Sequence, residues 1–388
     1  MWSSSTMSIS SWARCSDMAA PLLIKARSTL GTWRPPDARR GRGVTANPTT
    51  RFDRFHAASF DDGWGGLDEE PAALRTEVFK DASRTVIARN TSPDIPFDRS
   101  INPYRGCEHG CVYCFARPSH AYLGLSPGLD FESRIFAKPD AAARLREELA
   151  KPGYRVAPIA MGTNTDPYQP LEKRLHIMRD ILEVLAETGH PMSIVTKSHL
   201  ITRDVDILSD MARRNLVRVF LSVTTLDLKL SRAMEPRAAT PAKRLEAIET
   251  LAAAGIPVGV MFAPVIPALN DHEMENVLRA ATAAGATSAG YILVRLPLEV
   301  RELFTDWLRE HYPDRAEHVL SRLRAMRGGQ ENDSRFGRRM RGQGVDADLL
   351  SLRFHQAVKR LGLNKSNLPL DCSRFIPPRA PSPQLSLF

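Results

Sequence analysis

Residues 107–114 read Cys-Glu-His-Gly-Cys-Val-Tyr-Cys and place three thiols, Cys107, Cys111 and Cys114, in one short loop. The spacings are C-x3-C and C-x2-C, and the next cysteine in the chain is Cys372. Thiolates are soft ligands that favour zinc, copper(I) or iron-sulfur clusters. A 4Fe-4S cluster usually has four cysteine ligands, so three leave one iron free to bind another molecule. We interpret the loop as the holder of an open iron-sulfur cluster.

A structural zinc site is the alternative interpretation of this loop. It would need His109 or Cys372 as a further ligand, because structural zinc sites usually have four ligands in two paired groups. The sequence has five cysteines and no second pair. Gly106 and Gly110 give the loop the backbone freedom to wrap around a larger group.

Apolar, β-rich segments alternate with helical patterns along the chain. The predicted strands are residues 100–106, 156–162, 192–197, 217–224, 256–262 and 289–296. The predicted helices are residues 140–150, 171–185, 205–213, 240–254 and 271–284. Such alternation indicates an α/β fold made of parallel βα units with right-handed crossovers. In folds of this kind the chemistry sits on loops at the carboxyl ends of the strands.

The cysteine loop resembles the signature of the radical S-adenosylmethionine (radical SAM) superfamily, C-x3-C-x-aromatic-C, with Tyr113 in the aromatic place. The resemblance implies a partial (β/α)6 barrel of the radical SAM type, related to the TIM barrel. It also implies two cofactors: a 4Fe-4S cluster on Cys107, Cys111 and Cys114, and S-adenosyl-L-methionine (SAM) on the open iron. One electron would then cleave the sulfonium, and the 5'-deoxyadenosyl radical would take a hydrogen atom from a substrate. A reductant such as flavodoxin or ferredoxin is the implied partner.

The later segments GTNTDPYQPLE, TKS, SVTTLD and MEPRAATP resemble the radical SAM subgroup that includes spore photoproduct lyase and is often labelled DNA repair photolyase-like. The likeness covers about residues 80–375 and is greatest to uncharacterised bacterial members. SAM needs a cation for its carboxylate, and hydroxyls and a carboxylate for its ribose. The residues that the resemblance assigns to SAM are Tyr113, Thr163, Asn164, Thr165, Asp166, Lys197, Ser222, Thr224, Glu235, Arg237 and Gly259.

Their implied roles differ, and each has a structural alternative. Thr163–Asp166 would replace the glycine-rich amino-group motif, although Asp166 with Pro167 is also an ordinary turn and helix cap. Lys197, Ser222 and Thr224 would face the ribose and the carboxylate, although the two hydroxyls also fit a half-buried strand. Gly259 would lie near adenine. Glu235 and Arg237 equally fit a surface ion pair.

One departure from the subgroup concerns the return of the hydrogen atom. In spore photoproduct lyase a cysteine in the loop after the second strand does this, whereas the chain here has Thr163-Asn164-Thr165. Repair of the spore thymine dimer by the same route is therefore doubtful. Tyr104, Tyr168 and Cys372 are the alternative donors, and nothing in the sequence decides among them.

Charge and composition suggest the following domains. Residues 1–60 form a basic, disordered extension with nine lysines and arginines against three acidic residues, and 61–96 are a lead-in. Residues 97–310 form the core barrel, 311–376 a basic helical extension and 377–388 a proline-rich tail. Residues 321–388 carry thirteen cations against five acidic residues. Basic ends favour contact with nucleic acid, although they also fit solvated tails.

Location and chain start are further expectations. Cys15 and Cys372 are unpaired, and no run reaches the eighteen apolar residues of a membrane span, so we expect a cytoplasmic protein without a membrane partner. The first seventeen residues have low complexity, and we interpret Met18 as a truer start.

The C-terminal part combines a basic stretch with a clamp-like end. Residues 335–344 interleave arginine with glycine, which fits either a phosphate-backbone contact or a lid over the barrel. Leu349, Leu350, Leu352, Phe354 and Val358 suggest a closing helix. Gln384–Phe388, behind a proline spacer, looks like the short peptide by which bacterial repair proteins bind the DNA sliding clamp, although an idle tail is equally open.

The sequence thus predicts a radical SAM enzyme whose hypothesised substrate is DNA, on the strength of the basic ends, the subgroup resemblance and the clamp-like end. A radical SAM enzyme that acts on a peptide or small molecule is the first alternative. A non-catalytic zinc module that binds nucleic acid is the second.

Overall fold

A seven-stranded sheet carries the core of the computed structural model, which describes residues 41–45, 47–48, 50–52, 74–365 and 368–378. The strand order is β10-β9-β8-β7-β6-β3-β2. Neighbours from β3 to β10 run parallel, and β2 is antiparallel to β3. The strands are β2 (Ile87–Arg89), β3 (Arg99–Ile101), β6 (Ile159–Met161), β7 (Met192–Thr196), β8 (Val217–Ser222), β9 (Val258–Val265) and β10 (Ser288–Leu293).

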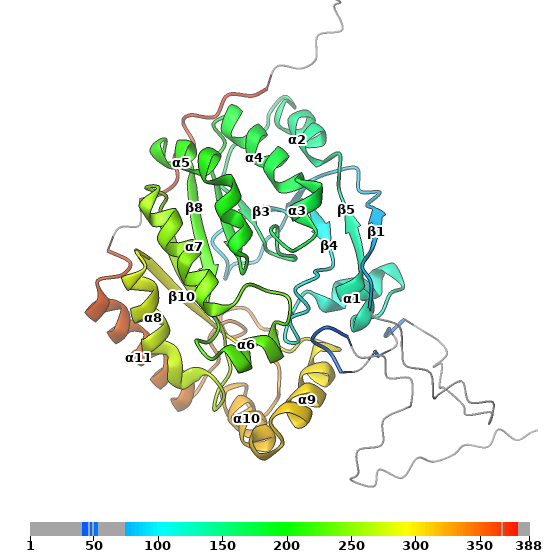
Figure 1. Ribbon diagram of the computed structural model, residues 1–388, viewed down its shortest axis with the longest axis vertical. Helices are drawn as coiled ribbons and strands as arrows, with labels where there is room; N and C mark the ends of the chain where they lie inside the picture. Colours follow the sequence, from blue (N-terminus) through cyan, green and yellow to red (C-terminus); the bar gives the residue numbers. More distant parts are fainter. Residues whose placement is uncertain (1–40, 46, 49, 53–73, 366–367, 379–388) are drawn as a thin grey trace, which may run out of the picture. The chain divides into compact units, whose positions relative to one another are not determined.

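Helices follow the parallel strands and cover one side of the sheet. Figure 1 shows α4, α5, α7 and α8 following one another along it, and α11 packs on α8. Their apolar faces are buried, because helices of βα units pack on the sheet. The helices are α2 (Ala141–Leu149), α3 (Glu172–Leu175), α4 (Ile177–Glu187), η2 (His199–Asp204), α5 (Val205–Arg213), α6 (Leu228–Met234), α7 (Pro241–Ala253), η3 (Asp271–Glu273), α8 (Met274–Ala283) and α11 (Val345–Leu361).

The predicted α/β fold with parallel βα units is confirmed, with two differences in detail. The expected strand 100–106 is divided: β3 ends at Ile101, and β4 (Tyr104–Arg105) joins another sheet. Pro103 lies between them and has no N–H to donate to a ladder. The expected helix over 171–185 is α3 and α4, separated by His176 in a left-handed conformation (φ 54°).

A small second sheet contains the strand that leads directly into the cysteine loop. Its order is β1 (Glu77–Lys80), β5 (Arg134–Ala137) and β4, with β4 antiparallel to β5. The elements η1 (Arg117–Leu123) and α1 (Leu129–Ser133) follow the loop. A second apolar cluster forms around α9 (Val300–His311) and α10 (Pro313–Met326); α10 lies in the expected helical extension, whereas no helix was predicted over α9, and Trp307 is fully buried in this cluster.

The predicted closing helix is α11, and only three of the five residues that suggested it face the core. Leu350, Phe354 and Val358 are buried in α11. Leu349 and Leu352 are 52% and 54% exposed. The reason is the helical period, because positions one or two residues from an inward one point away from the core.

Several expectations fall on parts of the chain outside the described residues. These are the start at Met18, Cys15, most of the basic extension and Gln384–Phe388, so clamp binding stays a prediction. Residues 41–45, in contrast, lie within the stretch expected to be disordered, and Gly43, Val44 and Thr45 are buried. In the described part of the chain, no helix has both the length and the apolar character needed to cross a membrane.

The basic stretch 335–344 lies beside the edge strand β10. The N–H of Leu293 donates to the carbonyl of Met340 (2.9 Å), and Arg339 pairs with Asp94, which lies between β2 and β3. The stretch therefore connects the regions of the two edge strands of the open sheet. Arg335 pairs with Asp333, so two arginines of the stretch already have carboxylate partners.

Arg327 holds this stretch from inside. Its guanidinium is buried and donates to the carbonyls of Arg338 and Arg339 (both 3.0 Å) and of Val294 (2.7 Å). Burial lowers its pKa to about 10, and Asp333 partly offsets this effect. One side chain thus ties the end of β10 to the basic stretch.

We expect Arg327→Leu to lower the free energy of unfolding by about 2–4 kcal/mol, because buried carbonyls lose charged donors. Denaturant unfolding followed by circular dichroism would measure this. Arg338→Leu is the control, since this side chain is exposed, and should change stability by less than about 0.5 kcal/mol. Equal stability of the two variants would contradict a structural role for Arg327.

Candidate functional site

The three predicted cysteine ligands share one cavity at the carboxyl end of the sheet. Cys107, Cys111 and Cys114 are free thiols and line a cavity of about 100 Å³. The N–H of Cys107 donates to the carbonyl of Phe131 (2.9 Å), which fixes the start of the loop. Gly106 has φ 81°, and a Cβ there would lie 2.9 Å from that same carbonyl oxygen. Glycine is therefore required immediately before the first cysteine.

A fully buried ion pair holds the backbone of the cysteine loop in place. Arg117 pairs with Glu132 (2.5 Å), and both side chains are fully buried. The same guanidinium donates to the carbonyls of Gly110 (3.1 Å) and Cys111 (2.9 Å) inside the loop. Charge-assisted hydrogen bonds of this kind are stronger than neutral ones. Arg117 thus fixes the backbone that carries the second cysteine.

An N-terminal segment, Gly41–Thr45, closes the other side of Glu132. The N–H groups of Arg42, Gly43 and Val44 donate to its carboxylate (2.5, 3.2 and 3.3 Å). A Cβ on Gly43 would lie 1.9 Å from the carbonyl oxygen of Gly110. The segment therefore packs directly on the cysteine loop.

The polar loop after β6 lines the same cavity. Its lining includes Thr163, Asn164, Thr165 and Asp166 together with Lys197 and Ser222. The hydroxyl of Thr165 donates to the carbonyl of Gly106 (2.7 Å). Gly162, with φ 82°, has no room for a side chain, because a Cβ would lie 2.1 Å from the carbonyl oxygen of Val195. Six of the eleven residues assigned to SAM thus lie beside the cysteines.

Asp166 connects three loops of the site. It accepts hydrogen bonds from the hydroxyl of Thr196 (2.7 Å) and the N–H of Lys197 (2.8 Å), and His109 lies 3.4 Å away. Burial raises the pKa of Asp166, but His109 and these donors hold it at about 2. Burial lowers the pKa of His109, but Asp166 raises it to about 10. The carboxylate is therefore occupied in positioning the cysteine loop against the β6 and β7 loops.

A second buried network lies behind the cysteines and contains three more of the assigned residues. Glu235 pairs with Arg244, and the hydroxyls of Tyr113 and Thr224 both donate to it. Burial raises the pKa of Glu235, but Arg244 and Lys197 bring it below its usual value. Tyr113, Thr224 and Glu235 do not line the cavity. Their network contacts the lining indirectly, because Arg244 also donates to the carbonyl of Ser222 (2.9 Å).

Two of the assigned residues lie elsewhere. Arg237 pairs with Glu108 (2.8 Å) and lines a different, basic cavity. Gly259 lies at the amino end of β9, where a Cβ would meet Ser288 and Phe220. These two neighbours line a cavity at the opposite end of the strands.

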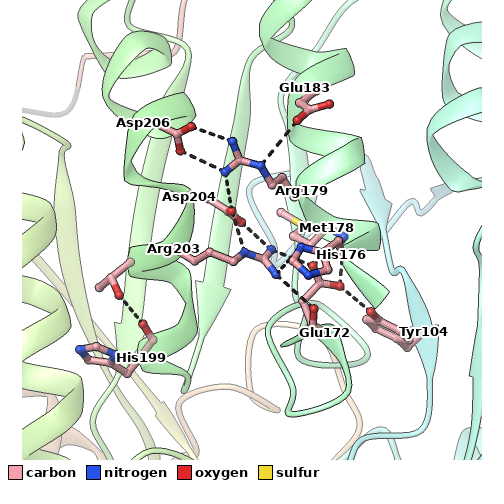
Figure 2. A network of polar contacts seen from close by, with 11 residues as sticks. Tyr104, Glu172, His176, Met178, Arg179, Glu183, His199, Arg203, Asp204 and Asp206 are labelled. Atoms are coloured by element: carbon pink, nitrogen blue, oxygen red, sulfur yellow. Dashed lines mark hydrogen bonds and ion pairs between the residues drawn. The ribbon is translucent and has the colours of Figure 1, made fainter. Parts of the chain in front are cut away.

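Figure 2 shows the polar network that anchors α3 and the start of α5. Arg203 donates to Glu172 and Asp204 (both 2.8 Å), and Arg179 bridges Asp204 and Asp206 (3.0 and 2.7 Å). Burial raises the pKa of Glu172. The network fixes the segment that follows the Thr163–Asp166 loop.

The alternative hydrogen donors lie away from the cysteine cavity. The hydroxyl of Tyr104 donates to Glu172 in the network of Figure 2, and Tyr168 is fully buried beside Arg203. Cys372 lies next to Asp371, which bonds to Asn215 before the amino end of β8 (2.9 Å). Neither of the tyrosines nor Cys372 lines the cavity.

The donor set fits a cluster better than one zinc ion. In the described part of the chain, no three His, Cys, Asp or Glu side chains surround a single ion position. His109 is already paired with Asp166, and Cys372 is at the other end of the strands. In a cubane cluster each cysteine binds a different iron, so the three thiols need not converge on one point.

Four residues with large structural roles were not singled out from the sequence. Arg117, Glu132 and Arg244 are fully buried charges, and Gln169 accepts the N–H of Glu108 (2.8 Å). Only Arg117 had a usable signal, because it follows Cys114 by three residues in a loop that needs support. The other three become visible only when distant segments are brought together.

Comparisons with known proteins identify a family and several relatives of this chain. The model of the Radical SAM superfamily matches residues 101–281. An uncharacterized protein of Mycobacterium tuberculosis strain H37Rv is 40% identical over 234 residues, 60% of this chain and 68% of that protein. An uncharacterized protein of Methanocaldococcus jannaschii is 27% identical over 225 residues, 57% of this chain and 79% of that protein.

Solved structures of spore photoproduct lyase share the fold. A mutant of that enzyme has a TM-score of 0.54 and 15% identity, covering 76% of this chain and 86% of that chain. The enzyme complexed with dinucleoside spore photoproduct has a TM-score of 0.53 and 16% identity, covering 74% of this chain and 80% of that chain. At these identities the likeness concerns the fold alone. Together with the family match and the cysteine loop, it leads to one conclusion: the chain belongs to the radical SAM superfamily.

Proposed function

We propose that this enzyme holds a 4Fe-4S cluster on Cys107, Cys111 and Cys114 and cleaves SAM reductively beside it. The observation that carries the proposal is the shared cavity, in which three free cysteines face a lysine and several hydroxyls. When bound, the cluster supplies the electron that splits the sulfonium of SAM and so starts hydrogen abstraction from a substrate.

The residues of the chain supply binding and orientation. Lys197 lines the cavity, and its ammonium lies 5.8 Å from the ring centre of Tyr113; because the other basic side chain of the lining, His109, is paired with Asp166, we assign Lys197 to the SAM carboxylate. Thr163 and Ser222 offer hydroxyls to the polar groups of SAM. Asp166 acts as a positioning residue, because its oxygens already bind the β7 loop. The pairing of Glu235 with Arg244 positions the guanidinium that holds the backbone of Ser222.

The substrate that we propose is nucleic acid. Phe115 lines the cavity and is 45% exposed, and the guanidinium carbon of Arg295 lies 4.9 Å from its ring centre. Tyr122 is 74% exposed and has Arg51 at 4.8 Å from its ring centre. Exposed aromatic rings beside arginines are the usual platform for stacking bases of single strands. The solved spore photoproduct lyase with bound AdoMet and dinucleoside spore photoproduct, at a TM-score of 0.50, supports the same substrate class.

A first prediction concerns the cluster. We expect Cys107→Ala, Cys111→Ala and Cys114→Ala each to lose most of the iron and all 5'-deoxyadenosine formation, because each removes one of three ligands. Iron and sulfide analysis of anaerobically purified protein and chromatography after reduction with dithionite would measure both. Cys372→Ala is the matched control and should keep both properties. One zinc and no iron in the unaltered protein would contradict the proposal.

A second prediction concerns SAM binding. Lys197→Met should weaken SAM binding by about tenfold or more, since a charge-assisted contact is lost, while leaving the iron content unchanged. Equilibrium dialysis with labelled SAM would measure the affinity. Lys229→Met, an exposed lysine on α6, is the control. Unchanged affinity in Lys197→Met would remove this residue from the SAM site.

A third prediction concerns the substrate. Phe115→Ala should weaken binding of a single-stranded oligonucleotide by about tenfold, because one stacked base contributes about 1–3 kcal/mol. Fluorescence anisotropy would measure the affinity at one fixed salt concentration. Phe336→Ala is a matched comparison, with Arg339 at 4.8 Å from its ring centre but no place in the cavity lining, and should bind as the unaltered protein does. If neither DNA nor RNA binds, a peptide or small-molecule substrate is favoured.

A further inference from the structure

The cysteine loop has a second face, which lines a basic cavity. Glu108, directly after Cys107, lines a cavity of about 720 Å³, whereas Cys107 and His109 line the cavity of the cysteines. Successive residues of the loop thus face two different cavities. The two cavities have no lining residue in common.

The lining of this second cavity is strongly positive. Five cations surround one carboxylate, and the remaining residues are Thr76 and the apolar Leu74, Pro170 and Leu171. The cations are Arg42, Arg75, Lys173, Arg174 and Arg237. Arg237 and Arg42 lie 2.8 and 3.9 Å from Glu108, so two cations already compensate the charge of this carboxylate.

Three of the cations are available to a partner. Arg75, Lys173 and Arg174 are exposed and form no ion pair with any described residue. Lys173 and Arg174 lie on α3, whose first residue, Glu172, is held by Arg203 in the network of Figure 2. The inner side of this short helix is therefore fixed while its outer side presents two cations.

We propose that this basic surface is the docking site of an acidic protein that carries single electrons to the cysteine loop. The inference rests on the proposed function, because it concerns the supply of the electron that SAM cleavage consumes. In each docking event the carrier loses one electron and the enzyme gains it, with no transfer of protons or groups. The floor of the surface, Glu108, is the direct neighbour of Cys107, which gives the electron a short path.

Charge and composition favour a protein over a nucleic acid here. The lining has no aromatic ring on which a base could stack, in contrast to the surface around Phe115. It combines cations with apolar residues, as protein interfaces do. A substrate must also reach the cavity of the cysteines, whereas an electron carrier needs only a route to the cluster. Opposite charges would steer the encounter and raise its rate.

The test compares two sources of electrons in the full-length protein with its cluster. Lys173→Glu combined with Arg174→Glu should lower 5'-deoxyadenosine formation by about tenfold or more with a reduced flavodoxin as donor. With dithionite, which needs no docking, the rate should be unchanged. Lys359→Glu combined with Arg360→Glu is the matched control, because this exposed Lys-Arg pair lies at the far end of α11. It should behave as the unaltered protein with both donors.

A binding measurement gives a readout independent of activity. Isothermal titration calorimetry should show that the double variant Lys173→Glu with Arg174→Glu, the α3 variant, binds flavodoxin about tenfold more weakly than the unaltered protein does. In the unaltered protein, affinity should fall steeply from about 0.1 to about 1 M salt, as the Debye length shortens from about 10 to about 3 Å. Arg75→Glu, outside α3, should give a smaller loss in the same direction and guards against misfolding of α3.

The possible failures can be told apart. If the unaltered protein makes no 5'-deoxyadenosine even with dithionite, the proposed function fails. If it does, but the α3 variant accepts electrons from flavodoxin normally, the docking surface is overturned. If that variant instead loses affinity for an oligonucleotide and keeps it for flavodoxin, the surface binds nucleic acid.

Discussion

The buried ion pair between Arg117 and Glu132 is the constraint on which the cysteine loop depends. One guanidinium binds carbonyls within the loop, and one carboxylate receives backbone N–H groups from a segment some ninety residues earlier. Removing either partner would leave the other as an uncompensated buried charge, which costs about 3–5 kcal/mol. The pair therefore makes the geometry of the loop part of the fold, so that the protein itself sets the positions of the thiols.

The sequence was sufficient for the parts of the molecule that are encoded locally. The spacing of the three cysteines, the apolar strands and the polar residues that follow them predicted the parallel sheet and the grouping of Thr163–Asp166, Lys197 and Ser222 beside Cys107. The parts that it missed depend on long-range contacts. Nothing near Glu132 in the sequence indicates that its partners are Arg42 and Arg117. Similarly, Gly259 shares a strand with residues near the site, but its position along β9 places it at the other end.

The carboxylates of the site show why the role of a residue could not be predicted from its type alone. Asp166 and Glu235 were both assigned to SAM, yet each is saturated by protein donors, Asp166 by two loops and Glu235 by Arg244. Buried charges need such partners. Asp166 and Glu235 therefore fix neighbouring segments of the site, while Lys197 and the hydroxyls of Thr163 and Ser222 are available to a ligand. The cysteine loop thus lines two cavities, one that contains the three cysteines and one that is lined by Glu108 together with Lys173 and Arg174 of α3.

The close contact of Gly43 with Gly110 has a practical consequence for anyone who shortens this protein. The low-complexity beginning of the chain invites trimming to the first strand at Glu77, because such trimming often helps expression and crystallisation. A cut there would also discard the three amide groups that solvate the Glu132 carboxylate. Shortened versions should therefore start well before Gly41, or the folded cysteine loop will be harder to obtain than in the untrimmed chain.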